Sequence, residues 1–335
     1  MRAIVLHGTD GNYRFETDWP KPEKPAGWAL IKVAYCGVCG SDIPRFSSAG
    51  SYHHPMILGH EFSGTVCEVS GNKFKVGDPV AVAPIIPCGT CAGCREMGPF
   101  HCENYQFLGS RNDGGFAEYC AVPETNLLKL ESAEILKAGS LVEPMAVGLH
   151  VVRRSGFSAG NTIVFGAGPI GLVVGLWLRE LGSQRVVLAD LRSRNLETAK
   201  NMGFETVNPA AVNISELGLF EYAFEAAGSN KALSDAVALL KGKGVLTVVG
   251  RDTNDTVLQR STLESFMRKE LSFLGCWGYD IRGEEKLIAK TLAKYAKPLE
   301  GIISHTVPVE DAVQVIGNMC SGRFEYCKVI VSFQR

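Results

Sequence analysis

Residues 162–190 read TIVFGAGPIGLVVGLWLRELGSQRVVLAD, and this stretch decides the fold of the second half of the chain. An apolar run at Thr162–Phe165 leads into Gly166-x-Gly168-x-x-Gly171, which opens an apolar helix pattern. The chain then returns in a second strand that ends at Asp190, 19 residues past Gly171. Strand, glycine turn, helix and acidic residue in this order form the dinucleotide-binding fingerprint. We therefore predict a nucleotide site at this turn.

The glycine turn suits a dinucleotide because its first glycine permits a tight turn and its second lets the backbone approach the pyrophosphate. The third lets helix and strand pack closely, and the helix N-terminus supplies free N–H groups. Asp190 is expected to hydrogen-bond both ribose hydroxyls and to repel a 2′-phosphate, which favours NAD over NADP, although Arg192 and Arg194 weaken that preference slightly. The predicted cofactor-binding residues are Gly166, Gly168, Pro169, Ile170, Gly171, Asp190 and Arg192.

Length and composition exclude several classes of protein. The chain has 335 residues, which favours two domains. Its 34 Lys and Arg against 35 Asp and Glu leave no basic excess to bind nucleic acid or an anionic membrane. Met1–Leu6 is too short for a signal-peptide core, and the glycine turn interrupts the uncharged run Ser155–Leu178. We expect a soluble, cytoplasmic protein with no nucleic-acid or membrane partner.

The pattern of predicted secondary structure changes near residue 160. The first 150 residues are β-rich and irregular, whereas strands and helices alternate afterwards, which predicts an α/β fold with a doubly wound parallel sheet. Two amphipathic helices, Glu284–Ala296 and Val309–Cys320, and an apolar run at Lys328–Phe333 follow, and the pattern does not assign them to either domain. The predicted strands are Thr162–Phe165, Arg185–Ala189, Tyr222–Glu225, Val245–Val249 and Leu271–Trp277, and the predicted helices are Ile170–Leu181, Arg194–Met202 and Lys231–Leu240.

The chain has eleven cysteines, and this odd number fits poorly with complete disulfide pairing. Four of them form Cys88-x2-Cys91-x2-Cys94-x7-Cys102 in a Pro/Gly-rich loop. Four thiolates bind Zn²⁺ tetrahedrally in closed, structural sites. An iron–sulfur cluster is the alternative, but ferredoxin-type runs continue with x3 and Cys-Pro rather than x7. Disulfides are a third reading, and they suit a cytoplasmic chain poorly.

A second set of metal-binding residue types is scattered over the first 150 residues. Cys39, His60, Glu61 and Glu143 offer a thiol, an imidazole and carboxylates, which suit a zinc ion that keeps one position open. From spacing alone the signal is weak, because a lone His-Glu pair is usually polar surface. Cys36-x-x-Cys39 also has the spacing of a redox pair, but it lies outside the region of alternating strands and helices.

These segments together resemble the zinc-dependent medium-chain dehydrogenase/reductase family over essentially the whole length. The matching segments are Gly37–Asp42, Gly59–Gly64, the four-cysteine run, Glu143–Gly148 and the glycine turn. The resemblance implies a GroES-like catalytic domain at 1–152 and 293–335, which carries a structural zinc lobe at about 86–104. It also implies a Rossmann NAD-binding domain at 153–292.

The stretch Glu143–His150 is similar to the polyol branch of the family, which includes sorbitol and threonine dehydrogenases. In that branch the resemblance places a catalytic zinc on Cys39, His60 and Glu61, with Glu143 as a direct or water-bridged ligand. Ser41 is then the group that accepts the substrate proton. Many members carry a histidine five residues after the zinc cysteine, and here Pro44 takes that place, so a relay must run through Ser41, the nicotinamide ribose and water, or through another residue.

The resemblance also implies a reaction. Ser41–Arg45 and Phe107–Tyr119 resemble branch members that oxidise galactitol 1-phosphate to tagatose 6-phosphate with NAD⁺. The alternatives are an unphosphorylated polyol, butanediol or L-threonine as substrate, or a non-catalytic NAD-binding protein on the same fold. A phosphate would need a cationic anchor, for which Arg45 and Arg111 are the candidates. Both arginines would otherwise be solvated surface or members of structural salt bridges.

The predicted strand Leu271–Trp277 would be an exposed sheet edge in a monomer. Pairing it across a two-fold axis removes that edge, as relatives do, so we expect a homodimer or a dimer-based homotetramer. The partners expected for this chain are thus a small polyol or polyol phosphate, two zinc ions, NAD and a second copy of itself.

Overall fold

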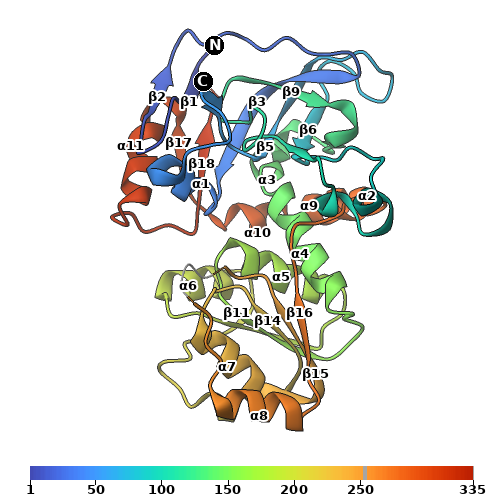
Figure 1. Cartoon of the computed structure of the whole chain (residues 1–335), viewed down its shortest axis with the longest axis vertical. Coiled ribbons are helices and arrows are strands. Elements are labelled where there is room, and N and C mark those ends of the chain that lie inside the picture. Colours follow the sequence, from blue (N-terminus) through green and yellow to red (C-terminus); the bar gives the residue numbers. More distant parts are fainter. Residues whose placement is uncertain (252–254, 335) are drawn as a thin grey trace. The chain divides into compact units, whose positions relative to one another are not determined.

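The computed structural model describes residues 1–251 and 255–334, and the chain divides into two units (Figure 1). The first unit contains Met1–Glu143 and Asp280–Arg335, and the second contains Pro144–Tyr279. Both breaks come earlier in the chain than the expected boundaries after 152 and before 293. The first comes earlier because helix α4 (Val142–Arg154) packs on the second unit, where the indole N–H of Trp177 donates to the Met145 carbonyl at 2.8 Å. The second comes earlier because helix α9 (Glu285–Lys294) packs against strand β10 (Leu127–Lys129).

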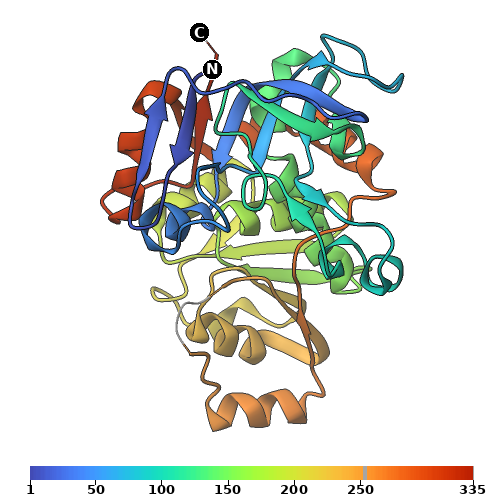
Figure 2. The same cartoon turned by 45° about the horizontal axis from the view of Figure 1, so that its top comes forward.

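The second unit is built on a parallel sheet, so the predicted α/β class with a doubly wound sheet is confirmed. Helices α5 and α7 lie on opposite faces of this sheet (Figures 1 and 2). In the order β13-β12-β11-β14-β15-β16 the strands are Glu205–Val207, Arg185–Ala189, Asn161–Phe165, Phe220–Glu225, Leu240–Val248 and Ser272–Gly275. The helices are α5 (Pro169–Glu180), α6 (Ser193–Asn201), α7 (Asn230–Leu239) and α8 (Arg260–Arg268).

The first unit is dominated by a mixed sheet in the order β10-β6-β5-β3-β18-β17, with β9 paired to β3. Strand β3 (Trp28–Val38) is central, because it pairs with β5 (Glu61–Glu68), β9 (Tyr119–Pro123) and β18 (Lys328–Ser332). The chain's last strand thus lies beside its third strand, so the C-terminal segment belongs to the first unit. The other strands of this sheet are β6 (Pro79–Val82) and β17 (Ile303–Pro308).

Smaller elements complete the first unit. A sheet in the order β2-β1-β4 lies beside helix α11 (Val309–Cys320), which packs on β1 and β2. Its strands are β1 (Ala3–Leu6), β2 (Tyr13–Glu16) and β4 (Met56–Ile57), and a hairpin joins β7 (Ile85–Ile86) to β8 (Gln106–Phe107). The remaining helical elements are α1 (Asp42–Pro44), η1 (Arg45–Ala49), α2 (Ala92–Glu96), η2 (Pro99–His101), η3 (Glu124–Asn126), η4 (Ala133–Ile135), α3 (Leu136–Gly139) and α10 (Ala296–Glu300), with η5 (Ile214–Leu217) in the second unit.

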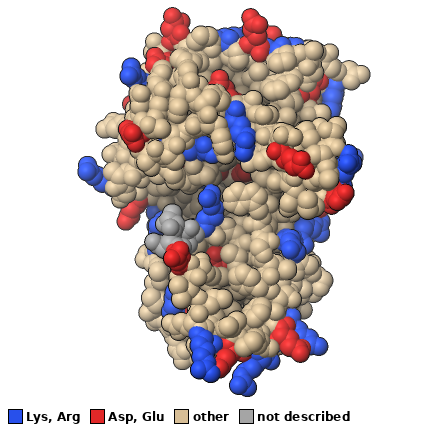
Figure 3. Space-filling view, in the orientation of Figure 1, with Lys and Arg blue, Asp and Glu red and all other residues tan. Residues whose placement is uncertain are grey.

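Each unit has its own buried apolar core, as two independently packed domains require. Acidic and basic side chains are interspersed on the face that Figure 3 shows. Over residues 1–251 and 255–334, no single helix is long and apolar enough to cross a bilayer; the segments Ala133–Gly139 and Val142–Arg154, bent by 58°, pass the same length and composition test only as a pair.

Candidate active site

The first candidate metal site lies where strands β3 and β5 run side by side. Cys39 directly follows β3, His60 directly precedes β5, and Glu61 is the first residue of β5. The antiparallel register pairs Gly37 with Glu61, which brings the ends of the two strands together. The ligand atoms of Cys39, His60 and Glu61 all lie within 4.8 Å of one another, and His60 and Glu61 are buried. A thiol, an imidazole and a carboxylate at this separation form a donor set that fits a zinc ion with one further position open.

Asp42 orients the imidazole of this cluster. Its Oδ1 lies 3.5 Å from Nδ1 of His60, within ion-pair distance, and neither atom has a hydrogen-bond partner among the described residues. Oδ2 of Asp42 accepts a hydrogen bond from the backbone N–H of Cys39 at 2.9 Å, so one carboxylate fixes two of the three donors. Burial lowers the pKa of His60, but Asp42 and Cys39 outweigh burial and raise it well above its usual value. With Nδ1 facing Asp42, Nε2 is the atom left for a metal.

Glu61 has a buried partner that the sequence analysis did not single out. Nζ of Lys328, at the start of β18, lies 2.8 and 2.7 Å from the two carboxylate oxygens of Glu61. No local signal marks this lysine, because it comes 267 residues after Glu61 and reads only as the start of an apolar strand. Its position follows from the sheet order, in which β3 separates β5 from β18.

Glu143 lies close to this cluster but outside the group of atoms that fall within 4.8 Å of one another. It is buried, and burial raises its pKa to about 7, with Glu61 and Asp42 adding to the rise while His60 and Lys328 oppose it. A buried carboxyl with this pKa is suited to take up and release a proton near neutral pH.

Ser41 and Pro44 bracket the short helix α1. Ser41 is exposed at its N-terminal end and makes no capping hydrogen bond, so its hydroxyl is not engaged by the helix. Pro44, the last residue of α1, has no titratable group and carries no proton.

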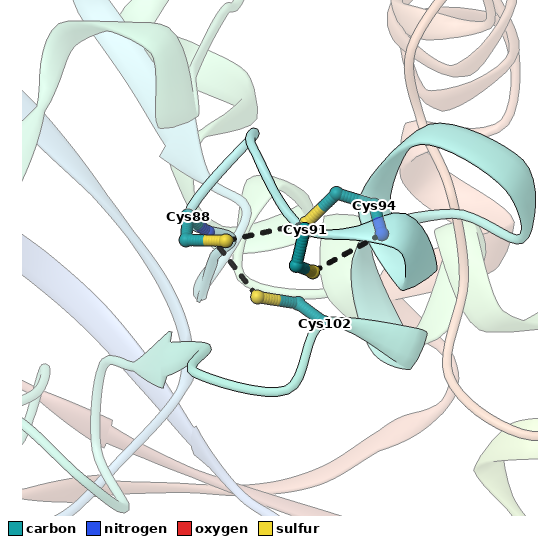
Figure 4. Close-up of side chains that lie close together, drawn as sticks. All are labelled: Cys88, Cys91, Cys94 and Cys102. Carbon is teal, nitrogen blue, oxygen red and sulfur yellow. Dashed lines mark hydrogen bonds between the residues drawn. The ribbon is translucent and has the colours of Figure 1, made fainter.

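The four cysteines of the predicted structural zinc lobe also come together. Their sulfur atoms all lie within 4.8 Å of one another, and Figure 4 shows the side chains of Cys88, Cys91, Cys94 and Cys102 converging from the loop around α2. Sγ of Cys91 accepts a hydrogen bond from the backbone N–H of Cys94, and Sγ of Cys102 accepts one from that of Cys88. Hydrogen bonds from Thr90 lower the pKa of Cys88 to about 6, which favours the thiolate that a metal binds. The donor set fits a closed zinc site.

The two predicted phosphate anchors share one aromatic ring. The guanidinium of Arg111 lies 4.3 Å from the ring centre of Tyr52 and 4.4 Å from that of Tyr105, and that of Arg45 lies 5.4 Å from Tyr52. Over the described ranges, neither arginine forms an ion pair with a carboxylate. The backbone N–H of Arg111 donates to the Phe107 carbonyl, and the Phe107 ring packs 5.6 Å from the ring of His60. Two cations without a carboxylate partner among the described residues thus lie against the ring of Tyr52, and the loop that carries Arg111 also contacts the metal cluster.

The predicted nucleotide residues border a cavity of about 330 Å³ in the second unit. The glycine turn is tight here: Gly166 has a φ of +98°, and a Cβ on Gly171 would lie 1.7 Å from the Gly166 carbonyl oxygen. Gly168 precedes α5, Pro169 is its first residue, and Ile170 follows in the first turn. Gly166, Gly168, Asp190 and Arg192 line the cavity.

Asp190 is more heavily bonded than ribose recognition alone predicts. Its carboxylate accepts hydrogen bonds from the backbone N–H groups of Ala167 and Arg192 and from Nδ2 of Asn195, at 2.7, 2.8 and 3.0 Å. A carboxylate offers about four acceptor positions, so the expected bonds to both ribose hydroxyls require one of these three donors to give way.

A second carboxylate near this cavity was missed from the sequence. Glu225, the buried last residue of β14, accepts hydrogen bonds from the backbone N–H groups of Ala227 and Ser229. Both residues line the cavity, so Glu225 fixes the backbone of part of its wall. The signal that was available is an acidic residue at the end of the apolar run Tyr222–Phe224, followed by Ala226-Ala227-Gly228.

Comparisons with known proteins agree with this geometry. The alcohol dehydrogenase GroES-like domain matches residues 25–132, and a zinc-binding dehydrogenase domain matches residues 169–294. Galactitol 1-phosphate 5-dehydrogenase of Escherichia coli (strain K12) is 33% identical over 331 residues, which cover 94% of this chain and 95% of that protein. Sorbitol dehydrogenase of Bacillus subtilis (strain 168) is 33% identical over 277 residues, 77% of each chain.

A solved structure of a relative has the same fold. The crystal structure of galactitol-1-phosphate dehydrogenase from Escherichia coli matches with a TM-score of 0.90 and 31% identity, and the match covers 99% of this chain and 100% of that one. The expected resemblance to medium-chain dehydrogenases is thereby confirmed, and the chain is an enzyme whose cofactors are zinc and a nicotinamide dinucleotide. It belongs to the zinc-binding alcohol dehydrogenase family, in its polyol branch, with a GroES-like and a Rossmann domain.

Proposed function

We propose that this enzyme oxidises a secondary alcohol of a sugar-alcohol phosphate with NAD⁺, with galactitol 1-phosphate as the first candidate substrate. The observation that carries the reaction class is the convergence of Cys39, His60 and Glu61 beside Asp42. Similarity to galactitol 1-phosphate and sorbitol dehydrogenases supports a polyol, and at 33% identity for both it leaves the phosphate to be argued from the chain's own residues.

Each residue of the candidate active site has a proposed role in this oxidation. Zinc, when bound, polarises the substrate hydroxyl and lowers its pKa, and the dinucleotide accepts the hydride. Cys39, His60 through Nε2, and Glu61 would hold the metal, while Asp42 fixes the imidazole. The exposed hydroxyl of Ser41 would accept the substrate proton and pass it toward water, since Pro44 leaves no histidine for that step. Glu143 lies near enough to the cluster to act as a water-bridged ligand or as a second proton acceptor.

Arg45 and Arg111 support a phosphorylated substrate. Each guanidinium stacks on Tyr52 without a carboxylate partner among the described residues, so both charges are available to an anion. Planar guanidinium groups bind phosphate oxygens in pairs. The carboxylate of Asp190, which accepts three hydrogen bonds at the wall of this cavity, supports NAD over NADP. The second metal, a structural zinc on Cys88, Cys91, Cys94 and Cys102, would bring the content to two zinc ions per chain.

The proposal includes self-association through the edge of the parallel sheet. Strand β16 ends the sheet order, and its far side pairs with no other strand of the described residues. Phe273 on β16 and Trp277 just beyond it are 47% and 59% exposed. An exposed apolar edge of this kind is typically covered by a second copy, which supports a homodimer or a dimer-based tetramer.

Substrate choice is tested by following NADH formation with galactitol 1-phosphate, galactitol, sorbitol, xylitol, butanediol and threonine. We expect the highest kcat/KM for galactitol 1-phosphate, and a Cys39→Ser variant that binds NAD but does not turn over. A higher kcat/KM for an unphosphorylated compound would overturn the phosphate, and full turnover by Cys39→Ser would overturn the metal site.

The phosphate anchor has its own test. Arg45→Ala and Arg111→Ala should each raise KM for the sugar-alcohol phosphate by about tenfold or more, since a charge-assisted pair is lost, with little change for the free polyol. Arg14→Ala, which removes an exposed arginine from β2 in the same unit, is the matched control and should change neither KM. Equal effects on both substrates would reject the anchor.

A further inference from the structure

Lys328 is a buried cation with no part in the reaction described above. Only 4% of the residue is exposed, and its Nζ contacts both oxygens of Glu61 and the carbonyl oxygen of Val38 at 3.3 Å. Lysine is almost never fully buried unless it is paired, and here the partner is one of the three residues that would hold the catalytic metal. The ammonium of Lys328 thus meets both oxygens of a buried carboxylate, so the contact is a charge-assisted pair inside the core.

The order of the strands in the sheet brings Glu61 and Lys328 together. Glu61 lies on β5 and Lys328 on β18, and β3 runs between them with Gly37 opposite both Glu61 and Ile330. A Cβ on Gly37 would lie 2.3 Å from Oε2 of Glu61. The missing side chain thus leaves the space in which the carboxylate and the ammonium meet across the central strand.

An ammonium that contacts a metal ligand is expected to weaken the bond between that ligand and the metal, whereas a carboxylate in the same place strengthens it. A carboxylate that hydrogen-bonds a ligand raises the basicity of that ligand and strengthens its bond to the metal. The ammonium attracts the carboxylate of Glu61 in competition with the metal, and it also repels a nearby metal cation. Because Nζ is within 2.8 Å of both oxygens, no oxygen of Glu61 is free of this competition.

We propose that Lys328 is a positioning residue that shares the carboxylate of Glu61 with the catalytic zinc, so that the metal is held less tightly and keeps more of its positive charge for the substrate hydroxyl. This inference rests on the proposed function, since it takes Glu61 as a ligand of that zinc. It predicts that removing the charge of Lys328 tightens the metal, whereas a merely structural lysine would loosen it when replaced.

The test measures how fast the holoenzyme loses zinc to excess EDTA, with zinc counted by atomic absorption. The phase of zinc loss that Cys39→Ser eliminates identifies the catalytic ion. Lys328→Gln keeps an N–H donor for Glu61 but removes the charge, and it should slow that phase by about tenfold or more, the scale on which outer partners change metal affinity. Lys328→Arg keeps the charge and should lose zinc at a rate within about twofold of the wild type.

Lys129→Gln is the matched control, because Lys129 also pairs with a buried carboxylate, Asp78, in the same unit. It should leave the rate unchanged. Zinc loss from Lys328→Gln that is equal to or faster than that of the wild type would overturn the inference. If that variant folds poorly by circular dichroism, Glu61→Gln is compared with Glu61→Gln/Lys328→Gln. The double variant should lose zinc more slowly, because it removes the ammonium that repels the metal once the carboxylate is gone, and an equal or faster loss would overturn the inference.

The two proposals fail in different ways. A holoenzyme without any zinc that depends on Cys39 would overturn the proposed metal site and the inference with it. A holoenzyme with two zinc ions, one of them dependent on Cys39, together with an unchanged rate in Lys328→Gln, would overturn the role of Lys328 alone.

Discussion

Asp190 braces the glycine turn in addition to its proposed contact with the ribose, because one of its three hydrogen-bond donors is the N–H of Ala167. Replacing Asp190 by Asn keeps an acceptor of the same shape but removes the charge that a 2′-phosphate would meet. We expect the ratio of kcat/KM for NAD over NADP to fall by about tenfold or more, because Arg192 lines the same cavity and can then pair with the phosphate.

Asp235→Asn is the control for this prediction. Asp235 lines the same cavity, but it is paired with Lys231 one helical turn away. Its replacement should leave the cofactor ratio unchanged. A similar fall in both variants would mean that the general field of the cavity, rather than a contact at the ribose, sets the preference.

Single residues could be predicted where neighbours in the sequence carry the signal. The glycine turn and the four cysteines each lie within a short stretch, and the structure brings together the residues that their spacing singled out. Lys328 could not be found this way, because its meeting with Glu61 depends on the order of three strands. The shared stacking of Arg45 and Arg111 on Tyr52 likewise joins residues from separate loops.

Among the elements, the loop around α2 has little regular secondary structure to hold it in place. Its helix has only five residues, and its turns are held by hydrogen bonds to cysteine sulfur. Cys94→Ser should therefore lose one zinc per chain and lower Tm by several degrees while NAD binding is kept, because closed zinc sites contribute folding free energy directly. Zinc content and a thermal melt check both parts.

Cys67→Ser is the matched control, since Cys67 lies on β5 in the same unit and outside both clusters. It should keep two zinc ions and the wild-type Tm. Iron in place of zinc in the wild type would favour the cluster alternative, and a Cys94→Ser variant that keeps both zinc ions would contradict the lobe assignment.

The periodicity of apolar residues in the sequence predicted the bounds of a long amphipathic helix well, and it predicted short helices and direct helix-to-strand transitions poorly. The helix predicted at Val309–Cys320 has those bounds in α11, because its apolar positions face the core throughout. The helix predicted at Lys231–Leu240 is α7 (Asn230–Leu239), and the chain enters β15 directly after it, so Leu240 belongs to a strand rather than to the helix. Helix α8 was not predicted, because its nine residues include only three apolar ones, of which Phe266 packs against the core while Leu263 and Met267 are exposed.

At the scale of the whole molecule, exposed apolar side chains gather at one edge of the parallel sheet. Leu258, Leu263 and Phe273 border a wholly apolar cavity between α8 and β16, and each of them is more than 40% exposed. An unpaired strand beside such a surface is a ready template for pairing with a second chain. The enzyme should thus sediment as a dimer or as a dimer of dimers.

Phe273→Asp tests this arrangement, because it places a charge on the edge strand itself while leaving the catalytic residues untouched. We expect the mass measured by light scattering to fall to that of one chain at micromolar concentration, since burying an unpaired carboxylate at the two-fold contact costs more than such an edge can offset. Val212→Asp introduces the same charge at another exposed apolar residue, which follows β13 at the opposite edge of the sheet, and it should keep the wild-type mass. A wild type that runs as a monomer, or a Phe273→Asp variant that remains a dimer, would show that β16 is not the contact between copies.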